Sequence, residues 1–374
     1  IIVDFLITMK VDCRIFILAS TIFLGVCDPE NASGDATTED PFWTNVCKKA
    51  VRHYMGITMV VDSSFHKEQC ESGFNRLLYL ETFVQTVNLY FANLRCSNVK
   101  LVLIKVVNLT TAVESKFERF KNTTESRGRS LDALLTLGLF REWANNQSFF
   151  NISDVVYLLT SHPVFDFVKA YRLEMKAASY AYGRCSKRRV ALGSDDGKTF
   201  SGVPAAVQQI ANLLGFKWDD RRDTQGCTPD DGHVMSRNGE RTKYPTFSEC
   251  TKNSWKYGTQ MGMGQSQCYI LNMSLAVNAS KTTPYTFFNC TEPCKNITQG
   301  SGNNALIMPA AMNERSNTMD ICKTSCCPDY VKQLNNTIEG APDGMPCGPH
   351  QVCLQQVCVK APWPRREVSK VVTS

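Results

Sequence analysis

Short apolar runs and longer amphipathic segments alternate along the first two thirds of the chain. The short runs are rich in Val, Ile and Leu and have the length of single buried strands. They are residues 57–62, 99–107, 154–160 and 189–193. The longer segments repeat apolar side chains every three or four residues, which predicts helices over 76–94, 129–144 and 204–215. Strands that alternate with helices favour an α/β fold, a three-layer sandwich with a mostly parallel sheet.

The residues at the predicted helix ends support two of these boundaries. Ser130 is a residue type that caps helix N-termini, so we expect it to open the helix over 129–144. Pro204 suits the first turn of the next helix, and Gly215 suits its end.

The composition changes near residue 260, where Cys, Asn, Thr, Gly and Pro become frequent and the periodicity weakens. Nine of the 17 cysteines follow this point: Cys268, Cys290, Cys294, Cys322, Cys326, Cys327, Cys347, Cys353 and Cys358. Such a segment has too few apolar side chains for a core of its own, so we expect disulfides to hold it. We therefore predict a main domain over 45–258, a cysteine-rich module over 259–360 and a basic, solvated tail over 361–374.

The N-terminal residues resemble a secretory signal. Lys10 and Arg14 precede the apolar run 15–26, which is short for a membrane span and suits a signal-peptide core. We expect a signal over 1–27, with residues 1–8 as possible upstream read-through, and a flexible acidic leader over 28–44. A signal anchor is the alternative reading. Cleavage after Cys27 leaves an odd cysteine count, so either one thiol stays free or intermolecular, or cleavage falls before Cys27.

Ten Asn-x-Ser/Thr sequons accompany the cysteines, which favours a glycosylated chain from an oxidising secretory pathway. They are Asn31, Asn108, Asn122, Asn146, Asn151, Asn272, Asn278, Asn289, Asn296 and Asn335. The formal net charge of +6 is spread along the chain, and no dense basic block with interleaved aromatics indicates nucleic-acid binding. No segment after the signal is long and apolar enough to predict a membrane span. We expect a secreted protein.

Several motifs occur in the order typical of one peptidase family. They are ITMVVDSSF, DVVYLLTS, SGVPAAVQQIANLLGFKWDD, DDGHVMS, YPTFSECT and APDGMPCGPHQVCLQQVCV. Together they resemble the reprolysin (adamalysin-like) branch of the metzincin zinc peptidases, and within it the secreted metallopeptidases of tick saliva. The resemblance covers roughly residues 50–360. It implies a five-stranded sheet, a substrate cleft between two subdomains, a turn around Met235 beneath the zinc, a Cys185–Cys227 disulfide and a backward pairing of Cys250.

The family's active-site motif is HExxHxxGxxHD, in which three His hold zinc and the Glu is the general base. Setting Gly215 on the motif's Gly places Asp219 on the trailing Asp. The four catalytic positions then fall on Gln208, Gln209, Asn212 and Trp218. Amide oxygens are weak zinc ligands, indole has no lone pair to donate, and Gln209 cannot take a proton from water. The sequence therefore predicts that the helix keeps the spacing of the family motif but has neither zinc ligands nor a general base. The alternative is that this segment is an ordinary amphipathic core helix that aligns with the motif by chance.

Two functional hypotheses follow from this comparison. The first is a pseudo-peptidase that uses no metal or other cofactor and acts by binding extracellular or host proteins. The second is an active zinc metalloendopeptidase that cleaves matrix or clotting proteins through unconventional ligands. A saliva component with no single partner is a third, weaker possibility. Zinc content and chelator-sensitive cleavage distinguish the first two hypotheses.

Overall fold

The computed structural model divides the chain into two units, Ile1–Thr44 and Asn45–Ser374. The residues that it describes all belong to the second unit; they are 53–92, 94, 99–122, 129–167, 173–220, 227–236, 244–260, 271, 275–277, 282–288, 322, 341–349 and 351–360. The expected signal, leader and basic tail lie outside them. So do the sequons at Asn31, Asn272, Asn278, Asn289, Asn296 and Asn335.

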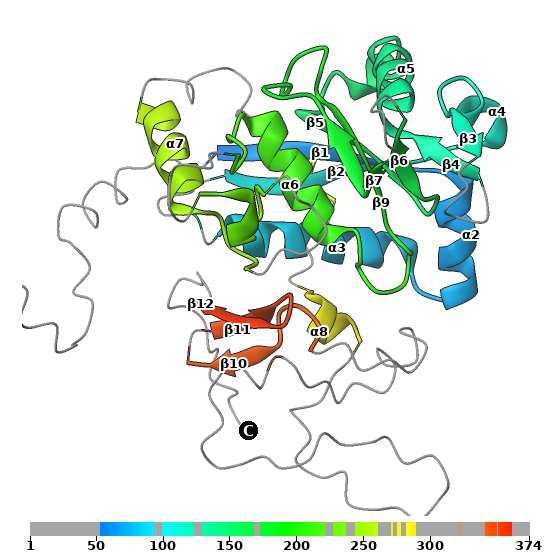
Figure 1. Cartoon of the computed structure of the whole chain (residues 1–374). Coiled ribbons are helices and arrows are strands. Elements are labelled where there is room, and N and C mark those ends of the chain that lie inside the picture. The colour runs from blue at the N-terminus through cyan, green and yellow to red at the C-terminus, as the bar shows by residue number, and fades with distance from the viewer. Residues whose placement is uncertain are drawn as a thin grey trace, which may run out of the picture. The chain divides into compact units, whose positions relative to one another are not determined.

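A five-stranded, largely parallel sheet forms the centre of the fold, as the sequence predicts (Figure 1). Its strand order is β2-β1-β5-β9-β8. The strands are β1 (His53–Val61), β2 (Val99–Asn108), β5 (Val155–Thr160), β9 (Val190–Ser194) and β8 (Ala177–Ser179). The first four are parallel, and β8 adds an antiparallel edge. The apolar runs that predict strands are those that the sheet buries on both faces.

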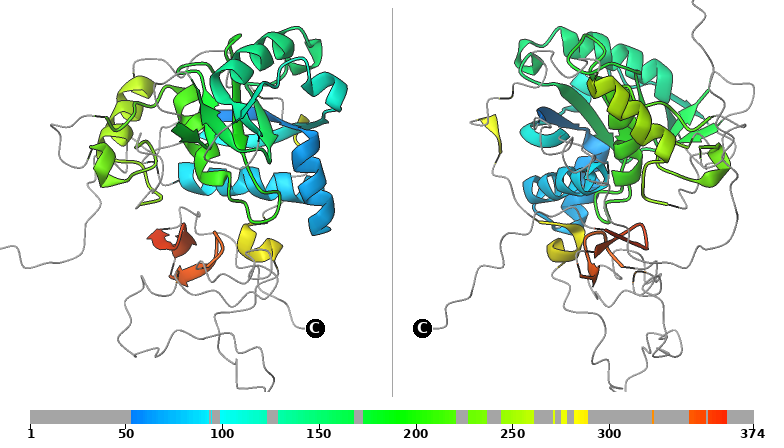
Figure 2. Two further views of the ribbon diagram at one scale, coloured as in Figure 1. Left: turned by 45° about the vertical axis from the view of Figure 1, so that its right-hand side comes forward. Right: turned by 90° about the vertical axis from the view of Figure 1, so that its left-hand side faces the viewer.

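Helices cover both faces of this sheet and complete three layers (Figures 1 and 2). On one face lie α3 (Arg76–Phe91) and α6 (Val203–Leu214), in one buried cluster with Met55, Ile57 and Met59 of β1. On the other face lies α5 (Ala133–Asn145), in a second cluster with Val60. Successive residues of β1 thus enter opposite layers, because side chains alternate along a strand.

A second, smaller sheet changes one prediction. Its order is β3-β4-β6-β7, and its strands are β3 (Phe120–Asn122), β4 (Arg129–Asp132), β6 (Val164–Asp166) and β7 (Leu173–Met175). The expected helix start at residue 129 and the Ser130 cap are wrong, because pairing with β3 and β6 holds β4 extended. The helix begins at Ala133, and the Asp132 side chain caps it by accepting from the Leu135 amide at 3.1 Å.

Several short elements lie at the ends of the strands and in the connections. They are α2 (Ser63–Ser72), α4 (Thr111–Glu114), η1 (Ser148–Phe150), η2 (Pro229–Asp231), α7 (Glu249–Gln260) and α8 (Pro284–Phe287). The apolar pattern does not predict α2, because only Phe65 and Gln69 of this helix are buried. Among the described residues, no helix has the length and apolar content that crossing a membrane requires.

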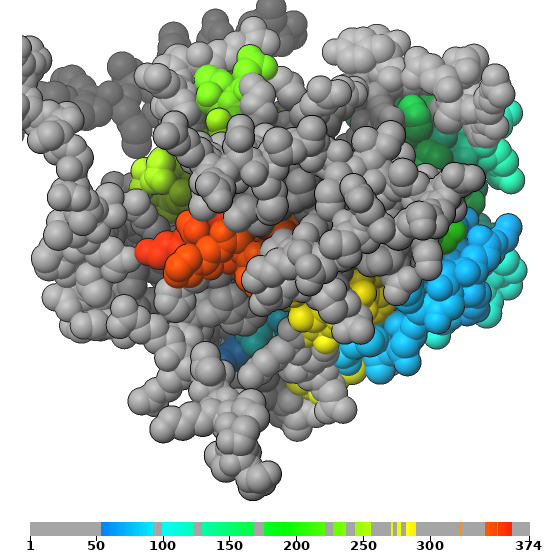
Figure 3. Space-filling view, turned by 90° about the horizontal axis from the view of Figure 1, so that it is seen from below, coloured from blue at the N-terminus to red at the C-terminus, as the bar shows by residue number. Residues whose placement is uncertain are grey.

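A disulfide-bonded cysteine cluster lies near the C-terminus, as expected. Three antiparallel strands, β10 (Pro346–Gly348), β11 (Gln351–Leu354) and β12 (Val357–Lys360), surround the Cys322–Cys353 and Cys347–Cys358 disulfides. The surfaces of these strands and of α8, in orange and yellow, face the viewer in Figure 3. Cys322, Ala341, Met345, Cys347 and Cys353 form a small buried cluster of their own, while Val352, Leu354 and Val359 join the cluster that contains α3. Disulfides and borrowed apolar contacts therefore hold this segment together.

The cysteine pairing beside α7 differs from the expectation. Cys227 bonds to Cys250, with Cα atoms 5.9 Å apart, so the expected Cys185–Cys227 disulfide is wrong. Cys250 does pair backward. The first turn of α7 brings Cys250 to Cys227, whereas Cys185 follows β8 and its Sγ lies 3.1 Å from Asp154 Oδ1. Cys185 is disulfide-bonded to a cysteine outside the described residues.

Candidate site on helix α6 and the turn around Met235

Local sequence explains where α6 begins and ends. Its apolar stripe is buried, Pro204 occupies the first turn, and Gly215 ends the helix with φ 90°. The ring of Tyr182 covers Gly215 so closely that an added Cβ would lie 2.3 Å from it. Gly215 is therefore required both by its left-handed backbone and by the contact with Tyr182.

The loop before α6 is organised around one buried carboxylate. Asp195 accepts hydrogen bonds from the Tyr79 hydroxyl at 2.7 Å and from the amides of Gly197 and Gly202 at 2.8 and 2.7 Å. Burial, together with the nearby Asp196 carboxylate, raises the pKa of Asp195 to about 7. Asp195 thereby connects α3, the loop and the first residue before α6 by hydrogen bonds.

The turn around Met235 lies against the segment that follows α6. Met235 is completely buried, and its carbonyl accepts from the Asp219 amide at 2.9 Å. The Asp219 carboxylate accepts from the Ser248 hydroxyl at 2.6 Å and the Thr251 hydroxyl at 3.2 Å, beside the start of α7. Asp219 and Met235 thus act as structural residues in this fold.

The first candidate side chain, Gln208, is bonded to that same turn. Its Nε2 donates to the carbonyl oxygens of Val234 at 3.0 Å and Ser236 at 2.9 Å. These acceptors require an N–H donor, which determines how the amide is oriented. Gln208 therefore links the middle of α6 to the turn directly.

The next two candidates are bonded to a different element. Ser179 of β8 donates from its hydroxyl to Gln209 Oε1 at 2.7 Å, and Asn212 Nδ2 donates to the same hydroxyl at 2.9 Å. Gln209 and Asn212 are buried. The hydrogen bonds of these residues therefore run in two directions, from Gln208 to the turn and from Gln209 and Asn212 to β8. Ser179 lies in a segment without strand periodicity, so no sequence signal indicates its role.

The remaining candidates lie nearby. Trp218 is half-buried and packs against the main hydrophobic cluster. The ring of His233 lies 5.4 Å from that of Tyr244, and its Nδ1 lies 3.5 Å from the Thr246 hydroxyl. Two aromatic side chains of this region are exposed, Tyr182 by 60% and Tyr244 by 45%. The apolar pattern of the sequence does not indicate these exposed rings.

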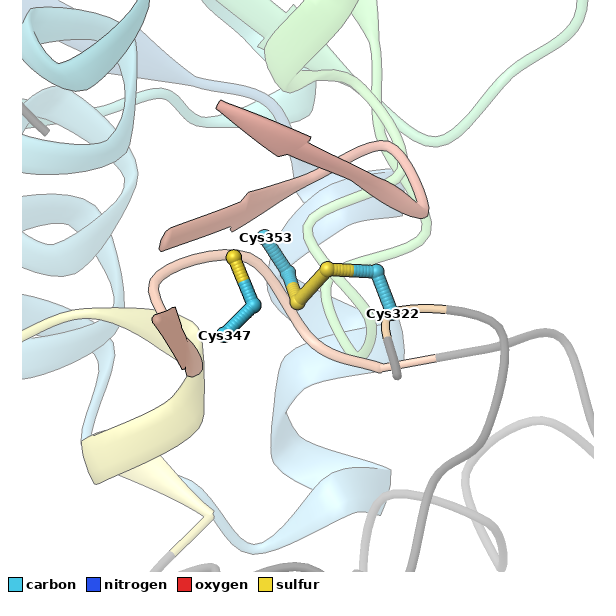
Figure 4. Close-up of side chains that lie close together, drawn as sticks. All are labelled: Cys322, Cys347 and Cys353. Carbon is cyan, nitrogen blue, oxygen red and sulfur yellow. A yellow bond between two sulfur atoms is a disulfide. The ribbon is translucent and has the colours of Figure 1, made fainter. Parts of the chain in front are cut away.

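Three cysteines near the C-terminus have sulfur atoms as close together as those of a metal centre. Sulfur atoms of Cys322, Cys347 and Cys353 lie within 4.8 Å of one another (Figure 4). However, Cys322 is bonded to Cys353 and Cys347 to Cys358. Disulfide sulfur offers no thiolate, the species that binds metals, so this group is a structural cluster.

The described sequons are compatible with modification. Asn108, Asn122, Asn146 and Asn151 are exposed. Asn108 Oδ1 accepts from Arg76 Nη1 at 2.8 Å, so a glycan on Asn108 would have to displace that contact.

Comparison with known proteins identifies one family resemblance. The model of the reprolysin (M12B) family of zinc metalloproteases matches residues 53–272. No curated protein matches the chain. Among solved structures, a chain from the structure of a chaperone–substrate complex is similar at 11% identity and a TM-score of 0.33, over 46% of this chain and 25% of that chain. The family match includes the central sheet, α6 and the turn around Met235.

Proposed function

Because the chain belongs to the reprolysin (M12B) family of zinc metalloproteases, we propose that it is a secreted pseudo-peptidase that acts by binding extracellular proteins. One observation carries the proposal: the polar side chains of α6, where this family places its zinc ligands, form hydrogen bonds within the protein. Gln208 donates to the turn around Met235, while Gln209 and Asn212 bond to Ser179.

These residues do not fit a zinc ion. Protein zinc sites use imidazole, thiolate or carboxylate ligands. The Nε2 group of Gln208 faces two carbonyl oxygens, and its Oε1 lies 3.5 Å from Gln209 Nε2. Asn212 directs its amide nitrogen to Ser179, and the indole of Trp218 has no lone pair to donate.

The position of the general base is also unsuited to hydrolysis. Gln209 is neutral, buried and already accepts from the Ser179 hydroxyl at 2.7 Å. An amide cannot take a proton from an attacking water, so this side chain would not generate a nucleophile.

The amide of Gln208 joins the middle of α6 to the turn around Met235. Two hydrogen bonds make that connection directly, so the connection needs no ion. This arrangement supports a protein that keeps the shape of a peptidase and loses its chemistry.

A binding role in the extracellular space draws support from the surface. The disulfides suit an oxidising compartment, and the four described sequons are exposed. Tyr182 and Tyr244 expose large aromatic rings, a residue type that dominates the energetics of protein interfaces. We propose that these two tyrosines contribute to the contact with the partner.

Metal content and cleavage test the proposal together. We expect purified full-length protein to contain no stoichiometric zinc by elemental analysis and to leave unfolded protein substrates intact. Chelator should change neither result. One zinc per chain, or cleavage that chelator abolishes, would instead establish the active metalloendopeptidase.

Partner binding needs its own measurement. Pull-down from extracellular fluid with the wild type and a Tyr182→Ala/Tyr244→Ala variant should recover a specific protein that the variant recovers less well. Equal recovery by both proteins would reject the role of the tyrosines.

A further inference from the structure

Three carboxyl groups gather at the end of β1, next to the N-terminus of α2. They belong to Asp62, which follows β1, and to Glu114 and Glu118, at and after the end of α4. Glu114 accepts from the amide and the hydroxyl of Ser63, both at 2.7 Å. These bonds connect the first residue of α2 to the last residue of α4; in Figure 1, α4 lies above α2 at the right of the molecule.

Two oxygens of this group have no donor. Asp62 Oδ1 caps α2 by accepting from the Phe65 amide and the Ser64 hydroxyl at 2.8 Å. Asp62 Oδ2 and Glu118 Oε1 are buried and lack any hydrogen-bond partner. Asp62 is 1% exposed and Glu118 is 9% exposed. The two carboxyl groups nevertheless approach within hydrogen-bonding range of one another. Two buried carboxylates this close are strongly unfavourable, so either a shared proton or a cation must lie between them.

The positive side chains nearby do not fill that role. The Arg129 guanidinium lies 4.9 Å from the centre of the Phe120 ring, and the His162 ring packs edge-on against the same ring at 4.8 Å. Among the described residues, neither Arg129 nor His162 forms an ion pair with these carboxyl groups.

A pocket connects the group to solvent. Its volume is about 630 Å³, and its lining includes Glu114 and Glu118 together with the hydroxyl-bearing residues Thr111 and Ser115. An ion could thus reach Glu118 and keep part of its water shell. The carboxyl and hydroxyl groups of the pocket offer oxygen atoms, which favour hard cations such as Ca²⁺ and Mg²⁺ over zinc; Arg129 and His162 also line the pocket.

We propose that Asp62 and Glu118 bind a hard divalent cation at the inner end of this pocket. The ion would join the end of β1 to the segment after α4. It would contact Asp62 Oδ2 and Glu118 Oε1, the two oxygens without a hydrogen-bond donor. This site uses no residue of α6, so it is independent of the function proposed above. A proton is the competing occupant, because burial and the neighbouring carboxylates raise the pKa of Glu118 to about 8.

Calorimetric titration of Ca²⁺, and separately Mg²⁺, into chelator-treated full-length protein tests the site. We expect binding of one ion with a Kd on the order of 10⁻⁴–10⁻³ M, the range of extracellular calcium modules. At ten times the Kd, the melting temperature should rise by about 3 °C. Glu118→Gln should weaken binding at least tenfold, and Asp62→Asn, which keeps an N-cap residue, should do the same. Glu142→Gln, an exposed position on α5, should bind as the wild type does.

Two results would overturn the proposal. Equal binding by the wild type and both carboxylate variants would place any ion elsewhere. No response to either cation would also overturn it. If the free energy of unfolding of the wild type then falls as the pH rises from about 4.5 to 8, and Glu118→Gln removes that fall, the pair holds a proton in place of a metal. The sign follows because a raised folded-state pKa stabilises the protein only while the group stays protonated.

Discussion

At the scale of single residues, the hydrogen bonds of the Gln208 amide give this side chain a structural role. Nε2 donates to two backbone carbonyls of one turn, an arrangement that neither imidazole nor carboxylate could reproduce. Ser179 plays the equivalent part for Gln209 and Asn212. Gln208, Gln209 and Asn212 of α6 therefore each have specific partners within the fold.

Gln208→Glu tests this accommodation with almost no change in shape. The carboxylate would face the oxygens of Val234 and Ser236 without a donor, so we expect a loss of about 2 kcal/mol or more in the free energy of unfolding at neutral pH. Acidification should recover part of the loss, because the protonated acid can again donate. Urea unfolding at pH 5 and pH 8 measures both effects. Gln147→Glu is the control, since Gln147 makes no side-chain cap hydrogen bond; similar losses in both variants would contradict the assigned role.

At the scale of elements, α6 depends on contacts at both ends. Asp195 orients the loop that leads into the helix, and Gly215 ends it beneath the ring of Tyr182. Hydrogen bonds and packing thus position each end of the helix.

Gly215→Ala separates backbone strain from the Tyr182 contact. Gly73 ends α2 with φ 72° and has nothing within 4 Å of an added Cβ, whereas Gly215 has the Tyr182 ring at 2.3 Å. Gly73→Ala should therefore cost about 1 kcal/mol from left-handed strain alone, and Gly215→Ala should cost more, on the order of 2–3 kcal/mol. Thermal and urea unfolding of the two variants provide the comparison. Equal losses would show that the Tyr182 ring moves freely aside.

At the scale of the whole molecule, a part-buried side-chain hydrogen bond joins the disulfide-rich segment to α3 of the main domain. The Tyr90 hydroxyl of α3 donates to Asp343 Oδ2 at 2.9 Å, while Asp343 Oδ1 accepts from the Gln355 amide at 2.7 Å. Desolvation raises the pKa of Asp343 to about 6, although the hydrogen bonds from Gln355 and Tyr90 act to lower it. Together with Val352 and Leu354 in the main cluster, the hydrogen bond from Tyr90 makes the described C-terminal strands part of the same compact unit.

Tyr90→Phe should weaken this connection while leaving the disulfides intact. Removing the donor leaves an oxygen of the half-buried Asp343 carboxylate without this partner, so we expect a loss of about 1 kcal/mol. Amides of β11 and β12 should exchange faster with deuterium, and those of β5 should change little. Tyr54→Phe is the matched control. Unchanged exchange in β11 and β12 would contradict a coupling through Tyr90.

The sequence alone determines the central architecture of this protein. Strands β1, β2, β5 and β9 and helices α3 and α6 are visible as local apolar patterns, because each must bury its own side chains. The spacing from Gln208 to Asp219 likewise defines the family frame. Only the tertiary structure decides the pairing of Cys227 with Cys250, the strand at Arg129–Asp132, and the partners Ser179 and Val234. It also brings Asp62 and Glu118 together. These contacts form between segments that are far apart in the sequence and come together only when the layers pack. Local periodicity carries no information about such long-range contacts.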